Sequence, residues 1–562
     1  MRWRADASHD QADSIAPICR SPIQRAPRTA ASRQDPALLL VLHEDDHQVQ
    51  ARQLSCSEFL PAAVNDGSVD IRGRDCPPAN LGMSGEPRIS LVFALVAATG
   101  LPLRDFIEQL SGLLVRYGFE PVQIRLTDLL QQHVLESGSV TWSNEAERIE
   151  RLMDAGDAFR AQLKRRDAMA LLATLGIQDE RRRRDPTKSY AYIVRQLKVP
   201  DEVSTLRQIY GDRLFVISAY STFAERLDNL IGNAKIEKTI ATRLIDRDEE
   251  DEYKTWGQRT RDAFELGDVF FRPSNAIKAD VERFLDLIFG RPDLSPLADE
   301  HAMYLAYAAS LRSADLSRQV GATITKGEGD IVSVGANDVA RSGGGLYWPG
   351  ADDRRDHTIG SDSNTKHKLA ITRDIFERTQ PDRKADPAAY EAFLRALDGS
   401  LLLDITEYGR PVHAEMEAVL SCVRNGISTR GARLYCTTFP CHNCAKHLVD
   451  AGIREVQYVE AYPKSMATKL YSDAIFWEEE AKPGEHHNGR VVFKHYAGVG
   501  PRRYMDLFAL TLSSGRRVKR KNKSGEISAW DPSRAEPRVP SDLGSIDLER
   551  QAIVELRTAM EK

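Results

Sequence analysis

Cysteine and long apolar runs are both scarce in this chain. Only 7 of the 562 residues are cysteine, which excludes the disulfide framework of a small secreted domain and favours a reducing compartment. No apolar run reaches the roughly 18 residues that a membrane span needs. The apolar stretch nearest the N-terminus, Ala37–Leu42, is too short for a signal peptide. We therefore expect a cytoplasmic protein that binds no membrane.

Neither sign of charge dominates. The chain has 77 Lys and Arg against 82 Asp and Glu, a net charge of -5, which gives no global electrostatic argument for nucleic-acid binding. Two short basic runs stand out, Arg181–Arg184 and Arg516–Lys523. Such runs are usually solvated loops or chain ends, and contact with phosphate or RNA is the alternative.

Composition divides the chain into four parts. Residues 1–84 are rich in Arg, Asp, Ser, Pro and Ala without sustained periodicity, so we expect disorder, or a leader ahead of a natural start at Met83. Residues 85–290 and 296–510 alternate apolar strand-like runs with helical patterns. Residues 515–562 have the composition of a basic, polar tail. The predicted fold class is α/β, with an N-terminal parallel-sheet domain and a C-terminal α/β/α domain.

The N-terminal part begins with a strand–helix–strand pattern. Ile89–Val96 is a continuous apolar run, which is typical of a parallel strand buried on both faces. Apolar residues then recur at helical spacing from Leu103 to Leu114, and a second strand is expected over Val122–Leu126. This order predicts a βαβ unit.

The first loop of this unit stands where phosphate-binding loops occur. It contains Ala98, Thr99 and Gly100, but Leu101 and Pro102 occupy the positions of the Walker lysine and Ser/Thr. Without that lysine, ordinary ATP hydrolysis or kinase chemistry is not expected. Two alternatives stay open: nucleotide binding through the loop backbone, and a scaffold that keeps only a kinase-like shape.

Two short motifs carry the chemistry of the C-terminal part, His413-Ala414-Glu415 and Pro440-Cys441-His442-Asn443-Cys444. This H-x-E…P-C-x-x-C pattern is the signature of zinc deaminases. His413, Cys441 and Cys444 would supply three zinc ligands and leave a fourth position for water. Zinc makes water acidic enough to act as a nucleophile near neutral pH, and Glu415 is the candidate for proton transfer. A purely structural zinc site would need a fourth protein ligand, and we expect Cys422 and Cys436 to be core residues instead.

The motifs fit an alternating α/β pattern. We expect helices over Ala414–Val423 and Cys444–Ala451, each beginning beside the metal ligands. Buried strands are predicted over Ala432–Thr437 and Ile453–Val459. A long polar insertion, residues 341–405, precedes the first motif.

The span 300–510 resembles the deoxycytidylate deaminase branch of the cytidine deaminase superfamily. The resemblance rests on Ser317–Ala322, Val334–Asn337 and the two zinc motifs. It implies that Asn337 contacts the bound nucleotide, that backbone groups around Ala414 help to hold it, and that Arg318 supports the phosphate side.

The larger span 85–510 is similar to the bacterial anti-phage dCTP deaminases, which join a degenerate P-loop kinase-like domain to a dCMP-type deaminase domain. Four segments carry this likeness: Arg148–Asp157, Tyr192–Lys198, Arg283–Gly290 and Tyr462–Ser465. The resemblance implies zinc-dependent conversion of dCTP, and also dCMP, to the deoxyuridine nucleotide and ammonia, which would starve phage DNA synthesis. It also implies restraint of the enzyme in healthy cells, by an inhibitory RNA partner or by the N-terminal domain and its nucleotide ligand, and we expect a homo-oligomer.

Three other functions remain as alternatives. A housekeeping dCMP deaminase would show a preference for dCMP over dCTP. A nucleic-acid-editing deaminase would need the two basic runs at the mouth of its active site. A non-catalytic nucleotide sensor is disfavoured by the intact His413 and Glu415 pair.

Overall fold

The computed structural model describes residues 90–133, 142–249, 255–273, 277–482, 484–511, 517–539 and 545–560. All of them belong to one compact unit, Met83–Lys562. The expectations for residues 1–84, including a start at Met83, lie outside the described residues. None of the described helices combines the length and the apolar character that a membrane crossing requires.

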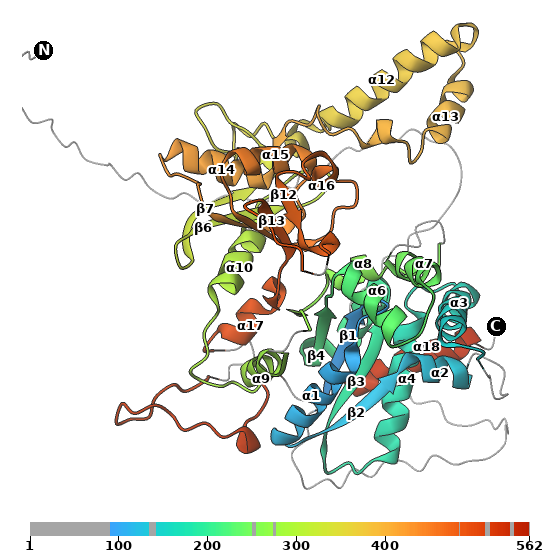
Figure 1. The fold of residues 1–562 in the computed structure, drawn as a ribbon, viewed down its shortest axis with the longest axis vertical. Coiled ribbons are helices and arrows are strands. Elements are labelled where there is room, and N and C mark those ends of the chain that lie inside the picture. The colour runs from blue at the N-terminus through green and yellow to red at the C-terminus, as the bar shows by residue number, and fades with distance from the viewer. Residues whose placement is uncertain are drawn as a thin grey trace, which may run out of the picture. The chain divides into compact units, whose positions relative to one another are not determined.

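Two six-stranded sheets organise the described residues (Figure 1). The first has the order β14 (Gly498–Val499), β5 (Val269–Phe271), β4 (Leu214–Ala219), β1 (Leu91–Ala97), β3 (Ser189–Leu197) and β2 (Phe119–Arg125). Its strands pair in parallel, except that β14 pairs antiparallel with β5. Every residue of β1 is buried, as the apolar run predicts for a strand covered on both faces.

Helices cover both faces of this first sheet. One face packs against α1 (Leu103–Arg116) and α9 (Ile277–Ile288). The other packs against α4 (Ala168–Arg183), α5 (Pro200–Tyr210) and α18 (Ser545–Met560). This half of the chain also contains α2 (Leu126–His133), α3 (Glu145–Leu163), α6 (Phe223–Gly232), α7 (Lys238–Glu249) and α8 (Thr260–Phe264).

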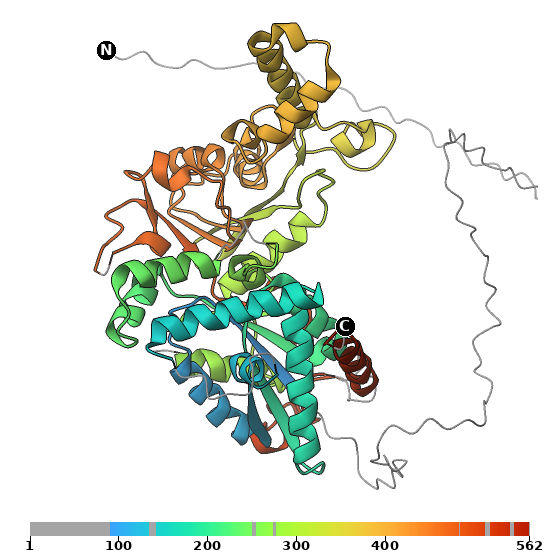
Figure 2. The same ribbon diagram turned by 90° about the vertical axis from the view of Figure 1, so that its right-hand side faces the viewer.

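The C-terminal segment corrects two expectations. The sequence predicts a polar tail from residue 515, yet α18 buries Ile553 and Leu556 in the core beside α4 (Figure 2). The basic run is not a loop, because Arg181–Arg183 form the last turn of α4, and Arg181 pairs with Glu549 of α18. An amphipathic helix at the chain end is hard to detect when charged residues occupy most of its surface.

The second sheet carries the zinc motifs. Its order is β12 (Ile475–Trp477), β13 (Val491–His495), β11 (Glu455–Glu460), β10 (Arg433–Thr438), β6 (Gly321–Lys326) and β7 (Asp330–Ala336). The first four strands pair in parallel. Strand β6 pairs antiparallel with β10, and β7 pairs antiparallel with β6. The α/β class and the predicted alternation of strands and helices are confirmed.

Helices α14 (Ala414–Arg424) and α15 (His442–Asp450) cover one face of this sheet, and α10 (Ala298–Ser310) packs on the other. Two glycines allow the close approach of these helices. A Cβ at Gly335 would lie 2.2 Å from the Ala414 carbonyl oxygen, and one at Gly321 would lie 1.9 Å from the Ala306 carbonyl oxygen. Glycine at 335 therefore lets α14, with the first motif, sit directly on β7.

The polar insertion is largely helical. It contains α11 (Asp356–Ile359), α12 (Ser363–Thr379) and α13 (Pro387–Ala396), and the last two form a hairpin that projects from the second sheet (Figure 1). Strands β8 (Asp338–Val339) and β9 (Pro411–Val412) pair across its base. This pairing returns the chain to the start of the first zinc motif.

Candidate metal centre and active-site cavity

His413 is the N-cap residue of α14 and directly follows β9. Its extended backbone (φ -68°, ψ 151°) turns the chain from the β8–β9 pair into the helix. The imidazole is thereby placed at the first turn of α14, and the side chain of the second helical residue, Glu415, lies on the same end of the helix.

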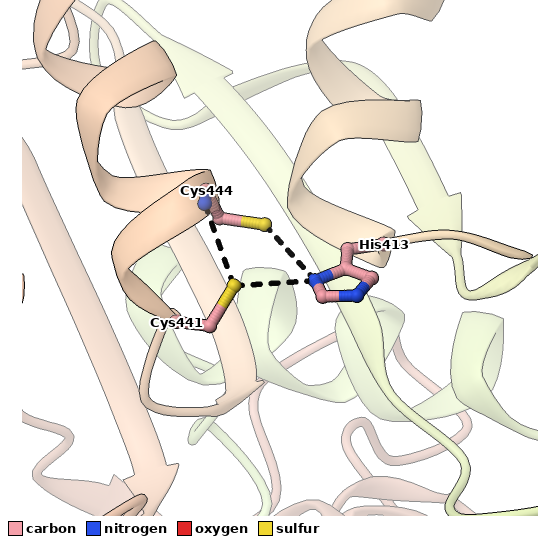
Figure 3. Close-up of side chains that lie close together, drawn as sticks. All are labelled: His413, Cys441 and Cys444. Carbon is pink, nitrogen blue, oxygen red and sulfur yellow. Dashed lines mark hydrogen bonds between the residues drawn. The ribbon is translucent and has the colours of Figure 1, made fainter. Parts of the chain in front are cut away.

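Cys441 is the N-cap residue of α15. Its sulfur accepts a hydrogen bond from the backbone N–H of Cys444 at 3.4 Å. Three-residue spacing on a first helical turn places both sulfurs on one side, and Figure 3 shows them pointing toward the His413 ring. The Nδ1 atom of His413 lies 3.3 Å from each sulfur.

These three side chains fit a zinc ion. Their ligand atoms all lie within 4.8 Å of one another. A tetrahedral zinc with Zn–S near 2.3 Å and Zn–N near 2.0 Å holds its ligand atoms roughly 3.5 to 3.8 Å apart. The described residues add no fourth His, Cys, Asp or Glu to this group, which is the donor set of a site with one open position.

The electrostatics of the sulfurs agree with metal binding. The pKa of Cys441 is lowered to about 4, chiefly by the hydrogen bond with Cys444 and also by His413, whereas the pKa of Cys444 is raised by its hydrogen bond with Cys441 and by burial. A helix N-terminus further favours a thiolate. Cys422 and Cys436 lie in the hydrophobic core of the sheet, outside the ligand group, as the sequence predicts.

Glu415 is buried beside the three ligands, with 4% of its surface exposed. Burial raises its pKa to about 7, and negative charge at Cys441 adds to this effect. A bound dication would act in the opposite direction. The carboxylate lines the same cavity as His413 and Cys441, so it can exchange protons with a molecule bound there.

Asn337 supports the cavity wall. Its side-chain oxygen accepts from the Val320 N–H at 2.7 Å, and its amide nitrogen donates to the Arg318 carbonyl at 2.8 Å. The side chain therefore holds the segment before β6 in place while it lines the cavity. Ala414 and Arg318 also line the cavity, and the Arg318 guanidinium lies 5.4 Å from the centre of the Tyr462 ring. The structure thus brings all three predicted substrate-binding residues to one cavity.

The cavity also contains residues that the sequence analysis did not identify. Arg166, Arg259, Arg261 and Glu265 come from the half of the chain built on the first sheet, yet they line the cavity that holds His413. No motif marks them, and three of them, Arg259, Arg261 and Glu265, lie in residues 225–290, which have the composition of a charged helical connector. Only the packing of α8 against the second half reveals them.

The phosphate-type loop lies apart from this cavity and is filled by the chain itself. The Thr99 N–H donates to Asp248 at 2.7 Å, and Lys198 pairs with the other oxygen of Asp248 at 2.7 Å. Asn229 donates to the Gly100 carbonyl at 2.6 Å. Gly100 has φ +92°, and a Cβ there would lie 2.8 Å from the Arg226 carbonyl oxygen. A phosphate at the Thr99 amide would have to displace a fully buried carboxylate.

Residues 297–460 match the family model of the cytidine and deoxycytidylate deaminase zinc-binding region. This part of the chain carries a deaminase-type zinc-binding region. Its cofactor is zinc, and the His/Cys/Cys group supplies the donors.

Curated relatives agree over parts of their length. The chain is 43% identical over 79 residues to ComE operon protein 2 of Bacillus subtilis, covering 14% of this chain and 39% of that protein. It is 44% identical over 54 residues to the deoxycytidylate deaminase of Enterobacteria phage T4, covering 10% of this chain and 28% of that enzyme. It is 29% identical over 181 residues to a probable deoxycytidylate deaminase of Drosophila melanogaster, covering 32% of this chain and 68% of that protein. The chain thus spans less than half of the first two relatives.

Among solved structures, one match is the dCMP deaminase of cyanophage S-TIM5 in complex with dCMP and dUMP. The alignment covers 36% of this chain and 98% of the chain of that enzyme. The identity is 19% and the TM-score is 0.20.

Proposed function

We propose that the chain hydrolyses the amino group of cytosine in a deoxycytidine nucleotide, dCTP and also dCMP, to give the deoxyuridine nucleotide and ammonia. The observation that carries this proposal is the convergence of three metal ligands and a buried carboxylate on one cavity. The match of residues 297–460 to a deaminase family model supports it. Two of the relatives are named as a deoxycytidylate deaminase and a probable deoxycytidylate deaminase, which supports a deoxycytidine nucleotide as the substrate.

The chemistry divides between the metal and Glu415. Zinc, when bound, supplies an activated water. Glu415 takes a proton from that water and delivers it to N3 of the ring as the water oxygen bonds to C4. It then passes the second proton to the exocyclic nitrogen, the C4–N bond breaks, and ammonia leaves. Since Glu415 is buried, its proton exchanges with the substrate rather than with bulk water.

The residues around the metal position the base. Asn337 fixes the Arg318–Val320 segment through its two hydrogen bonds, so the substrate meets a preformed wall. Its second amide hydrogen and second oxygen lone pair stay available for the nucleotide. The backbone at Ala414 lies in the first turn of α14, where N–H groups have no partner within the helix and point to the metal side.

The purpose we propose is depletion of deoxycytidine nucleotides during phage infection. A sheet domain with a filled phosphate-type loop supports a role other than nucleotide phosphorylation. The rival is a housekeeping dCMP deaminase, which the names of the relatives favour. An editing enzyme is disfavoured, because neither Arg181–Arg184 nor the described part of the second basic run, Arg517–Lys523, lines the cavity.

Two measurements test these proposals. The purified zinc-loaded chain is assayed with dCTP, dCMP and a cytosine-containing single-stranded DNA, with Glu415→Gln as control; we expect turnover of free nucleotides only. Nucleotide pools are then compared in cells that express wild type or Glu415→Ala, with and without phage. Loss of dCTP and dCMP only with phage and the intact glutamate supports defence, whereas constant dCMP turnover without phage supports the housekeeping role.

A further inference from the structure

The active-site cavity is larger than a cytosine base and a sugar require. Its volume is about 1260 Å³, above the roughly 300–1,000 Å³ that is usual for small-molecule sites. The part that contains His413 and Glu415 belongs to the second half of the chain. Residues of the first half, Arg166 and the segment around α8, form another part of the wall.

The α8 segment is fixed to both halves of the chain. The N–H of Arg259 donates to the Lys198 carbonyl at 2.9 Å, which ties the start of α8 to the first half. Glu265, just after α8, accepts from the Ala461 N–H at 3.1 Å, which ties its end to the loop after β11. That loop continues into Tyr462, against which Arg318 packs. Arg259 and Arg261, at the start of α8, therefore line the cavity on a segment that is fixed at both ends.

Three arginines of the first half line this space: Arg166, Arg259 and Arg261. Arg259 pairs with Asp262, and Arg261 pairs with Glu249 at 3.1 Å. These pairs are partly exposed and hold their guanidinium groups only weakly. Within the described residues, no acid lies at ion-pair distance from Arg166. Each guanidinium has five N–H donors and suits bidentate binding of phosphate oxygens.

We propose that Arg166, Arg259 and Arg261 form a subsite for the outer phosphates of a deoxynucleoside triphosphate whose base lies at the zinc ligands. The inference rests on the proposed deamination and adds the residues that select a triphosphate. In this proposal the α-phosphate, which a monophosphate shares, lies at the cations of the second half, such as Arg318 and Lys464, and only the outer phosphates use the three arginines. The first half of the chain thus completes the substrate site of the second.

Acidic residues nearby do not prevent this binding. Asp262 and Glu249 are already paired with Arg259 and Arg261. Burial, together with Glu460 and Asp262, raises the pKa of Glu265 to about 8. Glu265 is therefore mostly uncharged at neutral pH and adds little repulsion toward phosphate.

The test uses the full-length, zinc-loaded chain. Arg166→Ala is the sharpest variant, because its removal breaks no ion pair, and Arg259→Ala/Arg261→Ala is the second. Arg243→Ala is the matched control, an exposed arginine that pairs with Glu150 away from the cavity. We measure kcat/KM for dCTP and dCMP, and binding of both nucleotides to each variant in a Glu415→Gln background.

We expect kcat/KM for dCTP to fall roughly 10- to 100-fold in both cavity variants, mainly through KM, as for lost charge-assisted hydrogen bonds. The value for dCMP should stay within about twofold, which also reports correct folding. An equal loss for both nucleotides, or no loss for dCTP, would overturn the subsite. If wild type deaminates neither nucleotide, the proposed function fails, and the binding measurements still decide whether the arginines select dCTP.

Discussion

The two motif-bearing loops of this chain make an instructive pair. Each follows a buried strand that has a parallel neighbour and leads into a helix, so each offers polar groups at the strand's carboxyl end. At Ala98–Gly100 the chain itself binds these groups, because Asp248 accepts a hydrogen bond from the Thr99 N–H and forms an ion pair with Lys198. At Cys441 the sulfur faces His413 and a large cavity. A loop in the right place becomes a ligand site only where the chain leaves its polar groups unsatisfied.

Removing a metal ligand should have the largest effect. Cys441→Ser is expected to reduce zinc from about one per chain to nearly none and to abolish deamination, since two ligands cannot hold the ion against solvent. Zinc content by mass spectrometry and product formation measure this. The matched control is Cys422→Ser, a buried cysteine outside the ligand group, which should keep its zinc; a zinc-loaded, active Cys441→Ser would exclude Cys441 as a ligand.

Glu415→Gln separates proton transfer from metal binding. We expect kcat to fall roughly 1,000-fold, within the range for loss of a general acid–base, while zinc content is unchanged. Steady-state kinetics of ammonia release gives the rate. Near-wild-type turnover would rule out the role of Glu415.

Asp248→Asn tests whether the carboxylate that fills the loop at Thr99 stabilises the fold. The change leaves the partly buried Lys198 without its negative partner, so we expect the free energy of unfolding to drop by about 3 kcal/mol. Urea unfolding measures it, and Asp246→Asn, an exposed acid on the same helix, should change it little. An equally stable Asp248→Asn would mean that the loop does not depend on its internal carboxylate.

Asn337→Ala should weaken substrate binding without loss of zinc. Two hydrogen bonds to the Arg318–Val320 segment disappear, which corresponds to roughly a tenfold fall in kcat/KM. Asn425→Ala, at the exposed end of α14, serves as the control. An unchanged kcat/KM would show that the cavity wall holds without this side chain.

The smallest expected effect concerns pH. Glu265 faces Glu460, Asp262 and Arg318, and burial raises its pKa to about 8. It is uncharged below that pH and negative above it, so KM for dCTP should rise severalfold between pH 7 and 9. Glu265→Gln cannot ionise and should flatten this rise relative to wild type. A rise of the same size in both proteins would assign it to another group.

The sequence predicts the metal-ligand group of the second half, because its donors lie in two short motifs. Spacing places Cys441 and Cys444 on one helical turn, and His413 and Glu415 at another helix start. The α/β class follows from apolar runs such as Leu91–Ala97. By contrast, α18 and β14 join the first sheet from far along the chain, and short or polar elements leave a weak periodic signal.

The same limit explains what was missed at the cavity. Arg259 and Arg261 are distant in sequence from the zinc motifs and belong to no motif of their own. The filled phosphate-type loop was also hidden, since Asp248 lies about 150 residues beyond Thr99. Contacts at such separation arise from packing, which local patterns do not encode.

The most direct test is hydrolysis of dCTP and dCMP by the zinc-loaded chain in water enriched in 18O. We expect a deoxyuridine nucleotide that carries one 18O at C4 of the ring, one ammonia for each product, loss of both after chelation, and recovery when zinc is returned. A folded chain with one zinc bound that leaves both nucleotides unchanged would contradict hydrolytic deamination at His413, Glu415, Cys441 and Cys444.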